Sequence, residues 1–147
     1  MPNWCLNRLA VYGPELEVNA FRKRAVGHSP WTGNREGEEA NLLNFHNLVP
    51  IPAEVLTAGY DPAGINWERG NWGCAYGAYG SEIVDEWEGL VAYAFLTAWS
   101  PPIEFLTAAA KQFAAFTFML DYNEPDVGFK GIAKFKGETV EHYSLDY

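Results

Sequence analysis

The sequence predicts an α+β fold in which an antiparallel sheet carries two helices on one face. β-type segments and two amphipathic helical segments follow one another as strand, helix, strand, strand, helix, strand, with a hairpin at the end. The chain has 147 residues, enough for one domain with one substantial core. Hydrophobic residues make up 48% of it, which argues against disorder.

The first strand and the first helix occupy residues 4–27. Residues 4–12 are strand-like and stop at Gly13-Pro14. A proline is favourable in the first turn of a helix, and the acidic residues that follow suit the positive end of the helix dipole. Apolar residues then recur at helical spacing up to Gly27, which ends the helix.

Residues 28–68 are predicted to be an insertion between the first helix and the second strand. The stretch 28–41 is polar and rich in turn-forming residues, which is typical of an exposed loop. Residues 42–52 are predicted to be extended, because they contain two prolines and a residue before proline avoids the helical conformation. A helical turn is predicted at 53–59.

The second and third strands are predicted at residues 70–79 and 90–99. Glycines in the second strand indicate a bulge, or the close approach of another backbone or a ligand. The acidic segment 81–89 is predicted to be the solvated connection between the two strands. Residues 90–99 are apolar on both faces, as expected of a central strand.

The second helix is predicted at residues 100–114, with Ser100 as its N-cap. Its two prolines stand where a missing amide donor costs nothing. Residues 116–122 then alternate as a fourth strand, and residues 126–147 are typical of a hairpin that turns at Gly137.

This order of elements is that of the split βαβ, or ferredoxin-like, fold. Its strands lie in the order 4-1-3-2, with both helices on one face. We therefore predict one ferredoxin-like domain over residues 1–147, with an insertion at 28–68 and a C-terminal hairpin extension at 126–147.

Five segments also resemble a known family, and they occur in this order: "MPNWCLNRLAVYG", "NLVPIP", "NWGCAYGAY", "TAWSPP" and "LDYNEPDVGFKG". Together they resemble the YubB-type, Api-like family of ferredoxin-like proteins of phages and conjugative plasmids. The resemblance implies a ferredoxin-like fold and an origin in a mobile genetic element. It implies no activity and no functional residues.

The charge of the chain restricts its partners. Ten Lys and Arg against nineteen Asp and Glu leave a net charge of −9, which opposes binding to the phosphates of nucleic acid. Lys130, Lys134 and Lys136 share one face of a predicted strand and leave a local basic stripe. No apolar run is long enough for a membrane span and no signal peptide is recognisable, so we expect a cytoplasmic protein that binds no membrane.

The two cysteines are predicted to be unbonded. In the 4-1-3-2 order the strand at 90–99 separates Cys5 from Cys74, and two strand spacings are roughly 9–10 Å. A disulfide requires Cα atoms within about 7 Å. The three histidines are scattered singly and no zinc-type spacing occurs, so neither a metal nor a cofactor is predicted.

The aromatic residues are predicted to gather at the two ends of the sheet. We expect strands one and three to run parallel, with strands two and four antiparallel to them. One end is then predicted to hold the ligand- or partner-binding residues, namely Tyr12, Asn71, Trp72, Tyr76, Trp99 and Ser100. The opposite end is predicted to hold a secondary set, namely Trp4, Tyr122 and Glu124.

Both sets have a packing alternative. Aromatic rings beside glycine-rich backbone form a surface on which a flat ligand can stack, but Trp72 and Trp99 would equally close the end of the core. Glu124 would bind a cation or a ligand amine beside Trp4, or it would bond Asn3 or a loop amide.

The sequence therefore predicts a non-catalytic binding protein of a phage or plasmid. It would capture a host or defence protein in the host cytoplasm, for counter-defence or host takeover. The alternatives are a small nucleotide-like ligand at the same aromatic end, or single-stranded nucleic acid, which the net charge disfavours. No catalytic residue is assigned, and an enzyme of unrecognised type stays open. The alternating C-terminal strand also predicts an exposed edge that pairs two copies into a homodimer.

Overall fold

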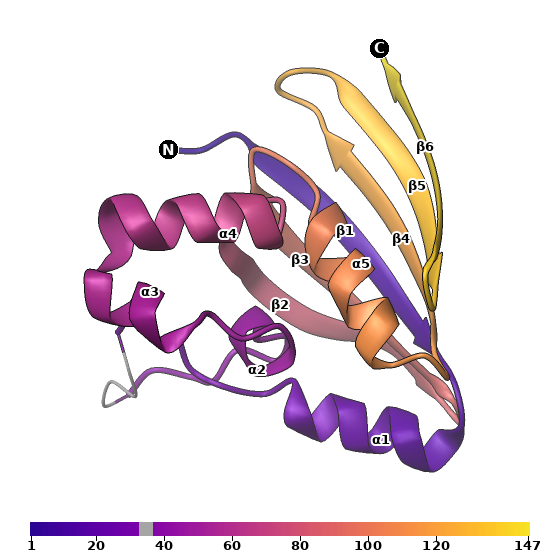
Figure 1. Cartoon of the computed structure of the whole chain (residues 1–147). Helices are drawn as coiled ribbons and strands as arrows, with labels where there is room; N and C mark the ends of the chain where they lie inside the picture. The colour runs from indigo at the N-terminus through magenta and orange to yellow at the C-terminus, as the bar shows by residue number, and fades with distance from the viewer. Residues whose placement is uncertain (33–36) are drawn as a thin grey trace.

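The strands of the computed structural model form one six-stranded sheet in the order β2-β3-β1-β4-β5-β6, and all neighbouring pairs are antiparallel (Figure 1). The structure describes residues 1–32 and 37–147. The strands are β1 Trp4–Tyr12, β2 Ala75–Trp87, β3 Leu90–Ala98, β4 Thr117–Glu124, β5 Phe129–Lys136 and β6 Thr139–Asp146. The first four have the ferredoxin-like order, as predicted.

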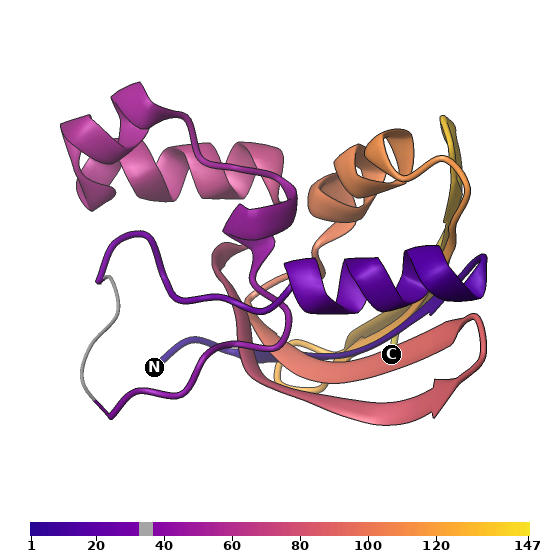
Figure 2. The same ribbon diagram turned by 90° about the horizontal axis from the view of Figure 1, so that it is seen from below.

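The described helices lie on one face of this sheet (Figure 2). They are α1 Glu15–Arg24, α2 Phe45–Leu48, α3 Ala53–Ala58, the π-helical turn η1 Tyr60–Gly64, α4 Ile65–Asn71 and α5 Ile103–Gln112. α1 and α5 are the two helices that the sequence predicts, and their placement on one face is confirmed. The others come from the insertion.

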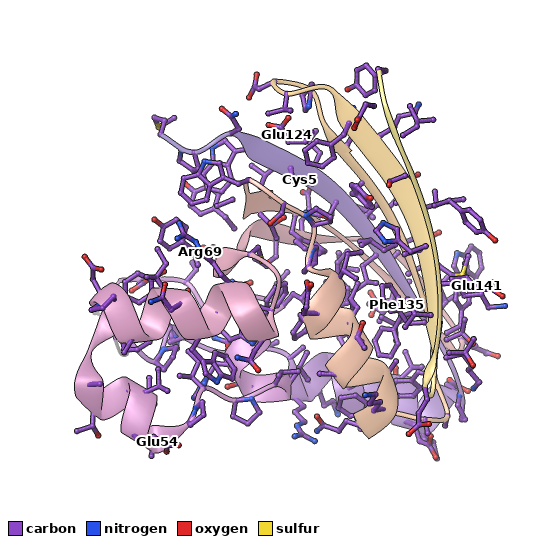
Figure 3. The ribbon with its side chains drawn as sticks, turned by 45° about the horizontal axis from the view of Figure 1, so that its top comes forward. Cys5, Glu54, Arg69, Glu124, Phe135 and Glu141 are labelled. Carbon is purple, nitrogen blue, oxygen red and sulfur yellow. The ribbon has the colours of Figure 1, made fainter. Side chains whose placement is uncertain are left out.

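The core lies between the sheet and the helices. Burial alternates along the strands, so that Leu9 of β1 is buried whereas Arg8 is exposed. Phe135 of β5 is likewise enclosed on the helix side, whereas Glu141 of β6 points away from the body of the protein (Figure 3).

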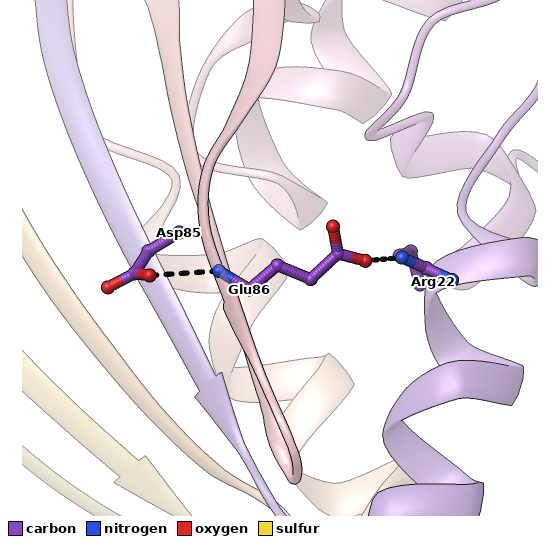
Figure 4. Close-up of polar contacts among 3 residues, drawn as sticks. All are labelled: Arg22, Asp85 and Glu86. Atoms are coloured by element: carbon purple, nitrogen blue, oxygen red, sulfur yellow. Dashed lines mark hydrogen bonds and ion pairs between the residues drawn. The ribbon is translucent and has the colours of Figure 1, made fainter.

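An ion pair links the last turn of α1 to the edge of the sheet. Arg22 pairs with Glu86 of β2, and the Glu86 backbone N–H donates to Asp85 Oδ1 at 2.9 Å (Figure 4). Both charged side chains are partly exposed, so the pair contributes at most about 1 kcal/mol. Glu86, the partner of Arg22, belongs to the acidic segment 81–89.

The acidic segment 81–89 is not a solvated connection, and this prediction is wrong. Residues 81–87 are the second half of β2, and only Glu88 and Gly89 connect β2 to β3. β2 is an edge strand of the sheet. Its acidic side chains therefore reach water and oppose pairing with other strands, which lets a charged segment form a strand.

Two other local predictions are also wrong. Residues 42–52 contain the short helix α2, because the Asn44 side chain caps it by accepting a hydrogen bond from the Asn47 backbone N–H at 3.0 Å. Ser100 does not cap α5, which begins after Pro102; its hydroxyl donates to the Gly73 carbonyl instead. The helical turn at 53–59 is confirmed as α3. The loop predicted at 28–41 includes residues 33–36, which lie outside the described residues.

The C-terminal hairpin extends the sheet beyond β4. β5 pairs with β4 and β6 with β5, and the chain turns at Gly137 as predicted. All residues of β6 are exposed, and its outer edge has no strand paired to it within the described chain. A homodimer through this edge stays a prediction.

Candidate functional site

The strand register brings Trp4, Trp72 and Trp99 to one end of the sheet. Ala98 at the end of β3 lies opposite both Trp4 of β1 and Ala75 of β2. Tyr12 lies opposite Leu90, at the other end. The expectation that β1 and β3 run parallel is therefore wrong. A crossover makes β1 and β2 parallel, and the hairpin after β2 sends β3 back between them.

The observed strand directions change where the residues of the two predicted sets lie. Trp72, Tyr76, Trp99 and Ser100 do lie at one end, but Tyr12 does not lie with them. The secondary set comes to the same end as the first, because β4 ends where β1 begins.

Trp72 belongs to the core. Only 3% of it is exposed, and its indole N–H donates to the Val49 carbonyl at 3.0 Å. Phe45 and Trp67 pack edge-on against the ring. The packing alternative therefore describes Trp72. Its neighbour Asn71 ends α4, where its amide donates to the Trp67 carbonyl at 2.9 Å.

Tyr76 and Trp99, by contrast, are held at the surface. They are 52% and 42% exposed, and their ring centroids are 6.0 Å apart. Both have the left-handed backbone conformation, with φ of 73° and 66°. This conformation costs a non-glycine residue roughly 1–2 kcal/mol. The Trp99 N–H donates to the Asn3 carbonyl at 2.8 Å, which helps to hold its backbone.

These rings continue into a row, here called the aromatic row, made of Trp31, Tyr60, Tyr76 and Trp99. Tyr60 stacks on Tyr76 with centroids 6.0 Å apart, and Trp31 meets Tyr60 edge-on at 5.1 Å. At the other end the Arg69 guanidinium lies 5.7 Å from the centroid of the Trp99 ring. This distance is within the range of cation–π contacts.

A buried carboxylate, Glu68 of α4, organises the row. It is 1% exposed. Its Oε1 accepts from the Tyr60 hydroxyl at 2.8 Å and from the Tyr76 N–H at 2.9 Å, and its Oε2 accepts from the Trp31 indole N–H at 3.1 Å. Burial raises the pKa of Tyr60, and the bond to Glu68 raises it further, so the hydroxyl stays a donor.

A cavity of about 360 Å³ opens beside Glu68. Its lining includes Trp31, Tyr60, Tyr76 and His46. His46 Nδ1 accepts from the Ile51 N–H at 2.9 Å, so the ring proton of the neutral form sits on Nε2. Burial lowers the pKa of His46, which favours this neutral form. The cavity therefore presents aromatic faces and a buried carboxylate.

The secondary set does not form a cation site beside Trp4. Asn7 and Tyr122 are cross-strand partners on the helix face, so Glu124 faces the same side while Trp4 faces the other. Trp4 stacks on Tyr79 with centroids 5.1 Å apart. Glu124 is buried and its Oε2 accepts from the Val127 N–H, which is the loop-amide alternative. Its Oε1 has no partner among the described residues.

Both cysteines are free and buried, and β3 lies between β1, which holds Cys5, and β2, which follows Cys74 (Figure 3). The prediction that they are unbonded is confirmed. Burial raises the pKa of Cys5 to about 12. Burial, and next the charge of Glu68, raise that of Cys74. Thiols in this state are poor nucleophiles.

Two features are absent from residues 1–32 and 37–147. In this part of the chain no three His, Cys, Asp or Glu side chains gather as a metal ion would require. No helix there is long and apolar enough to cross a membrane.

The lysines of the basic stripe partly have partners within the protein, since Lys134 lies opposite Glu141 and Lys136 donates to the Ala114 carbonyl at 3.1 Å.

Comparisons with known proteins place the fold in a family context. Residues 75–147 match the family described as "Ferredoxin-like domain in Api92-like protein". The crystal structure of the protein Api92 from Yersinia pseudotuberculosis has a TM-score of 0.75 at 10% identity, and the match covers 100% of this chain and 98% of that one. At this identity the likeness shows the fold. No curated protein matches the chain. The family match therefore concerns residues 75–147, and the structural match concerns the fold of the whole chain.

The family match begins at the first residue of β2, so five strands of the sheet lie inside the matched segment and β1 lies outside it. β1 lies outside the matched segment, although it pairs with β3 and β4 in the middle of the sheet. Glu68, Trp31 and Tyr60 also lie outside it, whereas Tyr76 and Trp99 lie inside. The cavity is therefore built at the junction of the matched domain and the insertion.

Proposed function

We propose that this protein is a non-catalytic binding protein that captures a protein partner through the aromatic row. The observation that carries the proposal is the backbone of Tyr76 and Trp99. Two large aromatic residues keep a costly left-handed conformation side by side, where glycine would be free of the cost. Local strain of this kind concentrates at functional sites.

The chemistry of the row supports a protein partner. Tyrosine and tryptophan dominate the binding energy of protein interfaces, since they bury large rigid surfaces at low entropic cost. Trp99 also carries the Arg69 guanidinium over its ring. The net charge of −9 would steer a basic partner toward this surface.

The biological setting of the proposal comes from the sequence resemblance. The five segments resemble proteins of phages and conjugative plasmids, and such a protein acts inside the host cell. We therefore propose a host or defence protein as the captured factor, in the host cytoplasm, for counter-defence or host takeover. The buried thiols with raised pKa and the enclosed Glu124 support a role without catalysis.

A small ligand is the second candidate, and the cavity beside Glu68 favours it. A volume of about 360 Å³ lies within the range of small-molecule sites. The buried carboxylate would repel phosphate groups, so a planar base without phosphate suits the cavity better than a nucleotide. A ligand of this kind would raise the melting temperature further as its concentration increases above the dissociation constant.

Affinity capture from the lysate of a bacterial host tests the proposal. The immobilised protein is compared with the Tyr76→Ala/Trp99→Ala variant and with Trp87→Ala, whose exposed ring lies at the opposite end of the sheet. We expect the same host protein on the wild type and on Trp87→Ala, and none on the double variant. Equal capture by all three folded proteins would contradict the proposal.

A further inference from the structure

We propose that the cavity beside Glu68 takes an arginine side chain of the partner, with Glu68 as its counter-ion. The inference rests on the proposed function, since the partner supplies the arginine. It adds a charged anchor next to the aromatic row and names the chemistry that the partner presents. Three features support this ligand: an open acceptor position on Glu68, the lack of a paired cation among the described residues, and the flat aromatic walls of the cavity.

The donors that the structure describes leave Glu68 one acceptor position. A carboxylate has about four lone-pair positions for hydrogen bonds. Among the described residues three donors use them, two on Oε1 and one on Oε2. Oε2 can therefore accept one further N–H from a group in the cavity that Glu68 lines.

All three donors to Glu68 are neutral. A buried carboxylate without a cation is costly, and its cost falls when a cation is placed against it. No Lys or Arg in residues 1–32 and 37–147 lies within ion-pair distance of Glu68. The adjacent Arg69 instead places its guanidinium over Trp99. The charge of Glu68 is thus available to a cation from outside the described chain.

The walls select a planar cation. Trp31, Tyr60 and Tyr76 line the cavity with aromatic surface, and a guanidinium group stacks on such surfaces while it donates N–H groups at its edge. An ammonium group lacks the flat face. His46 adds no repulsion, because its second donor is a neutral Nε2–H. Anions are excluded by the carboxylate.

Calorimetric titration of the full chain with N-acetyl-arginine amide tests the inference. We expect saturable binding, and binding at least about tenfold weaker for N-acetyl-citrulline amide, which has the same shape without the charge. N-acetyl-lysine amide is expected to bind between the two. No binding of the arginine probe, or equal binding of the citrulline probe, would overturn the inference.

Two variants separate a counter-ion from a structural carboxylate. Glu68→Gln removes the charge and is expected to lose at least about tenfold in arginine affinity. Tyr60→Phe keeps the ring and frees an acceptor position on Oε1, so it is expected to bind the arginine probe as tightly as the wild type or more tightly. A loss in Tyr60→Phe equal to that in Glu68→Gln would overturn the inference, and Tyr60→Phe decides if Glu68→Gln does not fold.

The outcomes also separate this inference from the proposed function. Capture of a host protein that depends on Tyr76 and Trp99, without arginine binding, would leave the proposed function standing alone. Arginine binding without such capture would support the arginine site in the cavity and contradict the proposed capture through Tyr76 and Trp99.

Discussion

Tyr76 and Trp99 lie with ring centroids 6.0 Å apart, and both residues have positive φ angles. One belongs to β2 and the other follows β3, so the hairpin between these strands places both at the same end of the sheet. The strain is stored in the backbone, whereas the function proposed for the site resides in the rings. Mutation to alanine or to glycine separates these two contributions.

Trp99→Gly is expected to be more stable than Trp99→Ala, by about 1 kcal/mol. Both variants lose the ring, but only alanine keeps the steric cost of a φ of 66°. Urea unfolding of the two proteins measures the difference. The same pair at Trp87, at the end of β2 and without positive φ, is the control, and there alanine is expected to be the more stable. If Trp99→Gly is no more stable than Trp99→Ala, the backbone at position 99 is not strained.

Trp72→Ala is expected to destabilise the protein by about 3–5 kcal/mol, because it empties a buried site between Phe45 and Trp67. Trp87→Ala, at an exposed position, is expected to change stability by about 0.5 kcal/mol or less. Chemical denaturation compares the two. Equal and small effects would show that Trp72 does not close the core.

Stability is expected to fall at alkaline pH. Burial raises the pKa of Cys5 from 9.0 to about 12 and that of Tyr93 from 10.0 to about 12. The folded state binds these protons more tightly, so the stabilisation is complete below pH 9 and is lost as the pH rises toward 12. Unfolding free energies across this window measure the slope. Cys5→Ala should have a shallower slope, and an unchanged slope would contradict the role of Cys5.

Gly64→Ala is expected to weaken binding in the cavity without touching Glu68. A Cβ atom there would lie 2.5 Å from the Trp31 ring and 3.1 Å from the Tyr60 ring, while the φ of −63° suits alanine. The new methyl group must therefore displace an aromatic wall. Calorimetric titration with N-acetyl-arginine amide measures the loss, and Gly70→Ala, with nothing within 4 Å of the added Cβ, is the control. Equal affinities would place the ligand elsewhere.

The order of the elements was sufficient to predict the sheet order, because the split βαβ pattern leaves few alternatives. The direction of β1 relative to β3 was misassigned, and this error alone moved Tyr12 to the wrong end. Glu68 was missed since α4 went unrecognised, as Gly70 and the asparagines around it are weak helix formers. The contacts of Glu68 include Trp31, which is 37 residues away in the sequence, so local patterns did not reveal its burial. The one hint in the sequence was that the charged residue Glu68 lies between Trp67 and Trp72.

The most direct measurement places a photo-crosslinker at the aromatic row in the host cell. Tyr76→p-benzoylphenylalanine and Trp99→p-benzoylphenylalanine are compared with Trp87→p-benzoylphenylalanine after irradiation. We predict covalent adducts of one and the same host protein at positions 76 and 99, and none at 87. Adducts at 87 alone, or none at either row position in folded protein, would contradict capture by the aromatic row.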